Sequence, residues 1–182
     1  MRGSLTSAKH QVRVLISEER VQERVGELAQ AITADYQNMC PILVCVLKGA
    51  VIFLADLARR LPFDLEMEFM AVSSYGQSTS SSGVVRILKD LDTNIEGRHI
   101  LIVEDIVDSG LTLQYLTSNL RSRNPASVEV VTLLSKPSRR IAEYGCRYTG
   151  FEILDEFVVG YGLDYGEKYR NLSYIGVIDG LG

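Results

Sequence analysis

Two adjacent carboxylates, Glu104 and Asp105, follow an apolar run at Ile100 to Val103. Such a pair suits two sugar hydroxyls or a hydrated Mg²⁺ ion, because two buried neighbouring carboxylates without a cation would repel each other. A small polar loop and the start of a helix come next, at Asp108 to Thr112, and backbone amides at a helix start suit a phosphate. Together the two features describe a site for a ribose 5-phosphate.

A nucleotide hydrolase also has an apolar strand that ends on acidic residues. Such an enzyme needs a G-x-x-x-x-G-K-[ST] phosphate loop, and the only Lys-Gly pair, Lys48-Gly49, lacks the preceding glycine of that loop. Three later glycines, Gly160, Gly162 and Gly166, have the wrong spacing for a dinucleotide fingerprint and precede no amphipathic helix. The sequence therefore disfavours both kinds of nucleotide site.

Length and composition indicate one globular domain. The chain has 182 residues, of which 46% are hydrophobic and 23% charged, as is usual for a folded domain with one core. Residues 1–4, Met-Arg-Gly-Ser, resemble the front of an expression tag, so we assign a single domain to residues 5–182. The formal net charge of -4 and the lack of a Lys or Arg cluster disfavour nucleic-acid binding.

Apolar runs and cysteines bear on the cellular compartment. Runs such as Ile42 to Leu47 are far shorter than the ~20 residues that cross a bilayer, and the N-terminus lacks the apolar core of a signal peptide. The three cysteines, Cys40, Cys45 and Cys146, form no C-x-x-C pair. We therefore expect no membrane partner, and reduced thiols that fill the core of a cytoplasmic protein.

The first part of the chain predicts a helix and then a strand with its own helix. Ser17 can cap a helix whose apolar stripe consists of Val21, Val25, Leu28, Ile32 and Tyr36. Ile42 to Leu47 is a continuous apolar strand, and Ala50 to Arg60 has a second helical pattern. This order is typical of a βα unit.

A polar segment, Ser73 to Gly83, separates two further expected strands at Glu66 to Val72 and Val84 to Lys89. It contains six Ser, one Thr and two Gly, so it cannot pack a core. It is either a plain hairpin loop or a lid over an active site.

Strands and helices continue to alternate after the acidic pair. The leucine spacing predicts a helix from Leu113 to near Asn124, and Val128 to Leu134 is a buried strand. The last strands expected in the core are Phe157 to Val159 and Tyr174 to Ile178. This order predicts an α/β fold with an open, mostly parallel twisted sheet flanked by helices, whose ligands bind beyond the carboxyl ends of the strands.

The stretch from Ile100 to Thr112 resembles the signature loop of the phosphoribosyltransferases that use phosphoribosyl pyrophosphate (PRPP). Four other segments look like those of the hypoxanthine-guanine phosphoribosyltransferases, and the similarity covers most of residues 12–180. These segments are Leu47-Lys48-Gly49, Ser74-Tyr75-Gly76, Lys136-Pro137, and Phe157-Val158-Val159-Gly160-Tyr161 through Asp164 to Arg170.

This resemblance implies the type I phosphoribosyltransferase fold, with a small hood that carries the base pocket. It implies a Mg²⁺-dependent purine salvage reaction in which PRPP and hypoxanthine, or guanine, give IMP or GMP and pyrophosphate. The displacement at the anomeric carbon needs no protein nucleophile, so alignment and stabilisation of charge on the pyrophosphate would supply the rate gain. A homodimer or homotetramer is the expected assembly.

The resemblance also assigns residues to the sugar and the phosphates. Glu104 and Asp105 would hold the ribose hydroxyls, directly or through Mg²⁺, and Asp164 would be the second contact of the metal; as structural residues the first two would instead cap a turn. The 5′-phosphate would lie on Ser109, Gly110, Leu111 and Thr112. Some family members have a basic residue at the position of Leu111, and its loss here leaves a cradle of backbone amides.

Asp108 is the expected general base, because an acceptor near purine N7 can take up the proton that leaves the imidazole ring. A helix N-cap is the alternative role for the same side chain, and the two roles are compatible.

The remaining assignments concern the pyrophosphate, the lid and the base. Lys48, Gly49 and Arg170 would bind pyrophosphate, and Ser74 and Tyr75 would belong to the lid. The base would be bound by the donor Lys136 at its 6-oxo group, by the ring of Phe157 and by the backbone of Val158. Because adenine leaves the lysine unpaired, it could be rejected by roughly 10⁴-fold.

Two other functions compete with this one. A regulator on the same fold would bind nucleotides without consuming PRPP, although the acidic chain with its lid and base pocket argues against it. A xanthine-preferring phosphoribosyltransferase would need a group that favours an extra 2-oxo oxygen, which the sequence does not identify. The ranking of hypoxanthine and guanine is also undetermined.

Overall fold

Six strands form the central sheet of the computed structural model, which describes residues 11–74, 85–142 and 145–179. Their order is β4-β3-β2-β5-β6-β7, and every pair is parallel except β3 with β4. The strands are β2 (Ile42–Leu47), β3 (Glu66–Ser74), β4 (Val85–Lys89), β5 (His99–Val107), β6 (Ser127–Ser135) and β7 (Tyr148–Glu152). The mostly parallel α/β sheet predicted from the alternating pattern is confirmed.

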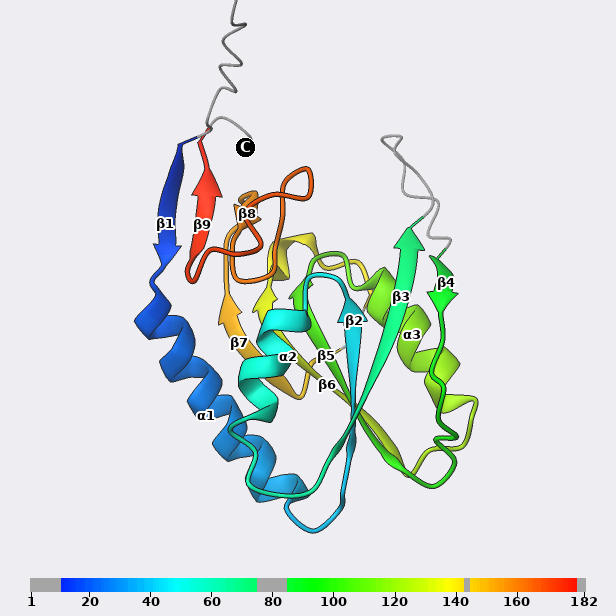
Figure 1. Ribbon diagram of the computed structural model, residues 1–182. Coiled ribbons are helices and arrows are strands. Elements are labelled where there is room, and N and C mark those ends of the chain that lie inside the picture. The colour runs from blue at the N-terminus through cyan, green and yellow to red at the C-terminus, as the bar shows by residue number, and fades with distance from the viewer. Residues whose placement is uncertain (1–10, 75–84, 143–144, 180–182) are drawn as a thin grey trace, which may run out of the picture.

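Helices cover both faces of this sheet (Figure 1). The helices α1 (Glu18–Tyr36) and α2 (Val51–Ala58) pack on one face against strand residues such as Leu43 and Leu101. The helix α3 (Leu111–Arg121) packs on the other face against residues such as Ile102. The sheet is therefore buried on both sides, which explains its continuous apolar strands.

The first helix forms as its sequence predicts. Ser17 is the N-cap of α1, and its side-chain oxygen accepts a hydrogen bond from the Arg20 amide at 3.4 Å. All five members of the predicted apolar stripe are buried. The strand predicted at Ile42 to Leu47 has the same bounds in the structure.

A second, antiparallel sheet in the order β1-β9-β8 lies near the carboxyl ends of the central strands (Figure 1). Its strands are β1 (Val12–Ile16), β8 (Val158–Val159) and β9 (Ile175–Ile178). The prediction that the last two would complete the central sheet is therefore wrong. An apolar pattern indicates a strand but not the strand with which it pairs. β9 pairs with β1, which lies at the other end of the chain.

Two strands are longer than expected. β5 runs to Val107, so Glu104 and Asp105 lie inside the strand and not after it, because β6 continues to pair beyond them. β3 includes Ser73 and Ser74 of the predicted loop, whereas Tyr75 and the rest of that lid up to Gly83 lie outside the described residues.

The structure tests the prediction that the cysteines fill the core. Cys45 is buried, but Cys40 is exposed, so its prediction as core filler is wrong; both are free thiols. None of the described helices combines the length and apolar character that a membrane crossing requires.

Candidate active site at the carboxyl edge of the sheet

Four neighbouring parallel strands deliver the predicted site residues to one edge of the sheet. Lys48 and Gly49 follow β2, and Asp108 to Gly110 follow β5. Lys136 follows β6, and Phe157 comes shortly after β7. Because these strands are adjacent and parallel, their carboxyl ends lie at the same edge.

The predicted phosphate loop surrounds a small cavity of about 100 Å³. The helix α3 begins at Leu111 after Gly110, whose φ of 81° lies in the left-handed region that favours glycine. Among the hydrogen bonds of the described residues, none uses the amides of Ser109, Gly110 or Thr112. Free amides at a helix start favour an anion in this cavity.

Gly110, and not Asp108, is the N-cap of α3, so the capping alternative for Asp108 is wrong. The carboxylate of Asp108 instead accepts a hydrogen bond from Arg139 Nε at 3.1 Å. The amide of Leu111 lies 3.4 Å from Ser109 Oγ, which weakens its case as a donor to a ligand.

A segment after β6 supports the phosphate loop from behind. The Ser109 carbonyl accepts hydrogen bonds from the amides of Ile141 at 3.0 Å and Ala142 at 3.1 Å. These two bonds fix the Ser109 carbonyl and so restrain the loop that lines the cavity.

The two adjacent carboxylates of β5 point to opposite faces of the sheet, as strand geometry requires. Glu104 lines the loop cavity on the α3 side. Asp105 lies on the other side against Gly49, where the Cβ of any larger residue would overlap its carboxylate. The pair therefore does not form one clamp on a single face, and it flanks the sheet edge from both sides.

Both carboxyl groups of this pair have raised pKa values. Burial raises the pKa of Glu104 well above its ordinary value, and the nearby Asp105 adds to the effect. Burial also raises the pKa of Asp105, although the Ile106 amide, which donates to its Oδ1 at 2.7 Å, acts against the shift. No cation among the described residues pairs with Glu104, so the pair would gain from a bound cation or from donor hydroxyls.

The predicted pyrophosphate residues lie close together but pair with acids. Lys48 Nζ lies 3.0 Å from Glu167, and Arg170 lies 2.7 Å from Asp164. Arg170 also donates to the Gly162 carbonyl at 2.8 Å, while its buried Nε has no hydrogen-bond partner. An anionic ligand that replaced Glu167 and Asp164 as the partner would therefore meet two cations, Lys48 and Arg170.

The predicted metal residues do not form a cage of protein ligands. Within the described ranges, no group of three or more His, Cys, Asp or Glu side chains is placed to hold a metal by itself. Asp164 is engaged by Arg170 and by the Glu167 amide. A metal here would need ligands from substrate and water.

Lys136, the lysine predicted to bind the base, is nearly buried and belongs to a chain of ion pairs. Lys136 Nζ lies 3.2 Å from Asp155 Oδ1, and Arg139 lies 3.4 Å from Asp155 Oδ2. Arg139 also pairs with Asp108, so four alternating charges connect the loops after β5, β6 and β7. Neither Arg139 nor Asp155 was predicted from the sequence, although Arg139 comes only three residues after Lys136.

Phe157 lies where a stacking residue could work. Its side chain is 40% exposed, which excludes the core role that Phe-Val-Val would ordinarily indicate. Its ring meets Tyr165 edge to face, with ring centres 5.6 Å apart. Tyr165 was also missed by sequence reasoning. Val158 is buried in β8, so its backbone alone can reach a base.

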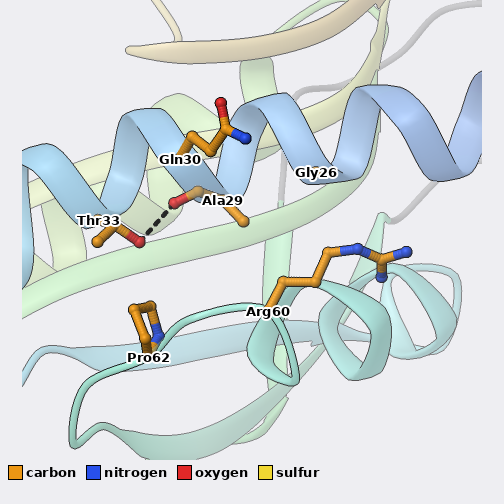
Figure 2. Close-up of a pocket in the computed structure, with 6 residues that line it drawn as sticks. All are labelled: Gly26, Ala29, Gln30, Thr33, Arg60 and Pro62. Atoms are coloured by element: carbon orange, nitrogen blue, oxygen red, sulfur yellow. Dashed lines mark hydrogen bonds between the residues drawn. The ribbon is translucent and has the colours of Figure 1, made fainter.

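A larger pocket of about 440 Å³ lies elsewhere, between α1 and the end of α2 (Figure 2). Its lining residues are Gly26, Ala29, Gln30, Thr33, Arg60 and Pro62. The hydrogen bond drawn there joins Thr33 Oγ1 to the Ala29 carbonyl within α1. Its one charged lining residue, Arg60, already pairs with Gln22 at 2.6 Å. The chemistry of the lining residues therefore favours the smaller cavity as the active site.

Comparisons with known proteins identify the family of the chain. The family model described as "Phosphoribosyl transferase domain" matches residues 16–166. A hypoxanthine-guanine phosphoribosyltransferase of Bacillus subtilis is 57% identical over 171 residues, covering 93% of this chain and 95% of that protein. One of Mycobacterium bovis is 58% identical over 172 residues, covering 91% and 85%.

A solved structure agrees with these sequence matches. It is a hypoxanthine-guanine phosphoribosyltransferase from Bacillus anthracis with a HEPES molecule in its active site. The TM-score is 0.89 at 45% identity, and the match covers 92% of this chain and 99% of that chain.

Proposed function

The chain belongs to the hypoxanthine-guanine phosphoribosyltransferases, and on this premise we propose that it transfers the phosphoribosyl group of PRPP to hypoxanthine and guanine. One observation supports this proposal above the others. The free amides of the loop after β5 lie beside a buried carboxylate and on the same sheet edge as Lys136. The amides can bind a phosphate, the carboxylate can bind a sugar, and Lys136 can bind an oxopurine.

In this proposal the loop after β5 binds the sugar phosphate. The amides of Ser109, Gly110 and Thr112 donate to the 5′-phosphate at the start of α3, where the helix dipole also favours an anion. Leu111 also belongs to this loop, but its amide already lies 3.4 Å from Ser109 Oγ. Glu104, which lines the cavity of this loop, accepts hydrogen bonds from the ribose hydroxyls, and Asp105 contributes from the opposite face of the sheet edge.

Mg²⁺ fits the oxygen donors of this edge. Asp105 would hold it, with Asp164 on the pyrophosphate side once Arg170 has turned toward the ligand, and Glu104, on the opposite face, would act on it through water or the sugar. Mg²⁺ ordinarily keeps several waters and takes few protein carboxylates, so the lack of a three-residue cage among the described residues is compatible with this metal. When bound, the ion would neutralise charge on the pyrophosphate and on the carboxylate pair.

The base is held by groups of the other loops. Lys136 donates to the 6-oxo oxygen, the exposed ring of Phe157 stacks on the purine, and the backbone of Val158 reads its edge. The lid, with Ser74 at its start and Tyr75 in it, would then cover the reacting atoms.

The reaction exchanges one bond at the anomeric carbon for another. Purine N9 forms the new bond to C1′ as the bond from C1′ to the pyrophosphate oxygen breaks, and Asp108 accepts the proton that leaves N7. Lys48 and Arg170 leave their acidic partners to stabilise the departing pyrophosphate, and the amide of Gly49 lies next to them. Alignment by both loops would supply much of the rate gain.

The setting of the reaction is part of the proposal. Free thiols and the acidic chain fit a cytoplasmic enzyme, without a membrane or a nucleic acid as partner. A homodimer or homotetramer fits the preference of such enzymes for closed symmetric assemblies.

The test is incubation of the purified protein with PRPP and Mg²⁺ and, separately, hypoxanthine, guanine, xanthine and adenine, with the products separated by charge. We expect IMP and GMP with one pyrophosphate each, and little product from adenine. Nucleotide from xanthine alone would instead support the xanthine-preferring enzyme. Binding of IMP without any turnover would support the regulator and contradict the proposal.

A further inference from the structure

Lys136 is a cation with little access to water. Its side chain is 10% exposed, and the acid that pairs with it is Asp155, at 3.2 Å. Asp155 is 47% exposed, but the low exposure of Lys136 distinguishes the pair from a surface ion pair between two solvated groups. The acid provides the negative charge that a buried ammonium requires.

From this geometry, and resting on the function proposed above, we propose that Asp155 is a specificity-determining residue that keeps Lys136 a pure hydrogen-bond donor toward the purine 6-oxo group. An ammonium has three donors and no acceptor, so it matches an oxygen and repels a donor amino group. A neutral amine has a lone pair and can accept a hydrogen bond from the 6-amino group of adenine. The charge on Lys136 therefore decides whether adenine is rejected.

The surroundings of Lys136 make Asp155 responsible for that charge. The charged groups joined to it in the ion-pair chain are Asp155, Arg139 and Asp108. Arg139 is itself a cation, and Asp108 reaches the chain only through Arg139. Without the carboxylate of Asp155, no acid among the described residues would contact the nearly buried Lys136 Nζ, and its charge would be left uncompensated.

Arg139 completes this arrangement as a positioning residue. It bonds the second oxygen of Asp155 at 3.4 Å and Asp108 at 3.1 Å, so it fixes the acid that faces Lys136 and ties it to the general base. Its backbone amide also donates to the Lys136 carbonyl at 3.1 Å. The group that reads the base and the group that takes its proton are thus held in one unit.

The test compares kcat/KM for hypoxanthine and for adenine in Asp155→Asn, at saturating PRPP and Mg²⁺ and at one neutral pH. We expect the hypoxanthine-to-adenine ratio to fall by on the order of 10-fold or more, with a rise in the hypoxanthine KM that exceeds the fall in kcat. Asp155→Glu should restore the ratio. Glu152→Gln removes a nearby exposed charge at the end of β7 and should keep the wild-type ratio.

A double-mutant cycle shows whether Asp155 acts through Lys136. In a Lys136→Gln background, Asp155→Asn should leave the ratio unchanged. An unchanged ratio in Asp155→Asn alone, or an equal change in both backgrounds, would overturn the inference. Thermal unfolding of each variant verifies folding. If the wild-type protein itself makes no IMP, the proposed function fails, and that result is distinct from any change among the variants.

Discussion

The two halves of the proposed site, a phosphoribose half and a base half, lie at the same sheet edge, but their charges are partnered differently. The phosphoribose half consists of Glu104, Asp105 and the loop at 108–112. Glu104 is buried and Asp105 is partly buried, and the amides of Ser109, Gly110 and Thr112 lack acceptors among the described residues. The base half consists of Phe157 and of Lys136, Arg139 and Asp155, and these last three are joined by ion pairs within the chain.

This difference indicates how each half recognises its ligand. The phosphoribose half is incomplete without an anion and a cation or hydroxyls, so binding removes unfavourable burial of charge. The two cations of the base half are paired with Asp155 and with Asp108 of the loop after β5, so this half presents a fixed pattern of donors. The first arrangement favours affinity, and the second favours discrimination among bases.

The largest expected effect comes from Asp108, which belongs to both halves. Asp108→Ala should lower kcat by about 10²- to 10⁴-fold, because it removes the acceptor of the N7 proton. The Kd of PRPP should change far less. Steady-state kinetics and calorimetric PRPP titration measure the two quantities, and equal losses in both would make Asp108 a binding residue only.

Gly49→Ala tests the crowded side of the phosphoribose half. The new Cβ would overlap the Asp105 carboxylate, which must move. A displaced catalytic group can cost on the order of 100-fold in kcat/KM for PRPP.

Gly26→Ala is the matched control, since its Cβ meets no atom within 4 Å and lies inside α1. It should keep full activity and stabilise the fold by about 0.5 to 1 kcal/mol. Similar activity in the two alanine variants would show that Asp105 does not need its position.

Phe157→Leu tests the base half with a smaller effect. Loss of the aromatic face should weaken base binding by about 1 kcal/mol, or roughly 5-fold in the hypoxanthine KM. The Kd of PRPP in the absence of base should stay the same. If the Kd of PRPP changed as much as the hypoxanthine KM, the two halves would not act separately, and the comparison would be wrong.

Glu104→Gln tests the charge burial by unfolding rather than by activity. Burial raises the pKa of Glu104, so the folded state is fully stable below the ordinary value of 4.5 and loses stability as pH rises through the higher value. The variant should therefore be more stable than the wild type at pH 8, because it lacks the buried charge. The gain should shrink as pH falls toward 4.5 in urea unfolding of the ligand-free protein.

Asp35 provides the opposite case for the same experiment. A hydrogen bond from Tyr148 lowers the pKa of Asp35 below its ordinary value of 3.8, so its contribution to stability is present at neutral pH and is lost as pH falls through the lowered value. Asp35→Asn should therefore destabilise the protein at pH 8. If both variants shift stability in the same direction, the contrast between a ligand-completed acid and a structurally paired acid is wrong.

Local patterns were sufficient for much of the fold. The stripe from Val21 to Tyr36 and the cap at Ser17 specify α1 because cap and periodicity act within a few residues. The bounds of β2 follow from its continuous apolar run. Neither β1 nor β7 was predicted, and the sheet of β1, β9 and β8 was missed, because pairing between distant segments leaves little local trace.

The site shows the same division between local and distant information. The loop from Asp108 to Thr112 and its helix start could be predicted from one stretch of sequence. The opposite faces of Glu104 and Asp105 depended on how far β5 extends, which its pairing with β6 decides. Asp155 could not be predicted, because its role comes from the approach of the loops after β6 and β7.

A crystal structure with IMP bound tests the central claim most directly. We predict the 5′-phosphate within hydrogen-bond distance of the amides of Ser109, Gly110 and Thr112, and the 6-oxo oxygen at Lys136 with the Asp155 pair intact. A phosphate bound elsewhere, for example at Arg60 in the pocket beside α1, with the loop cavity empty of ligand, would contradict the account.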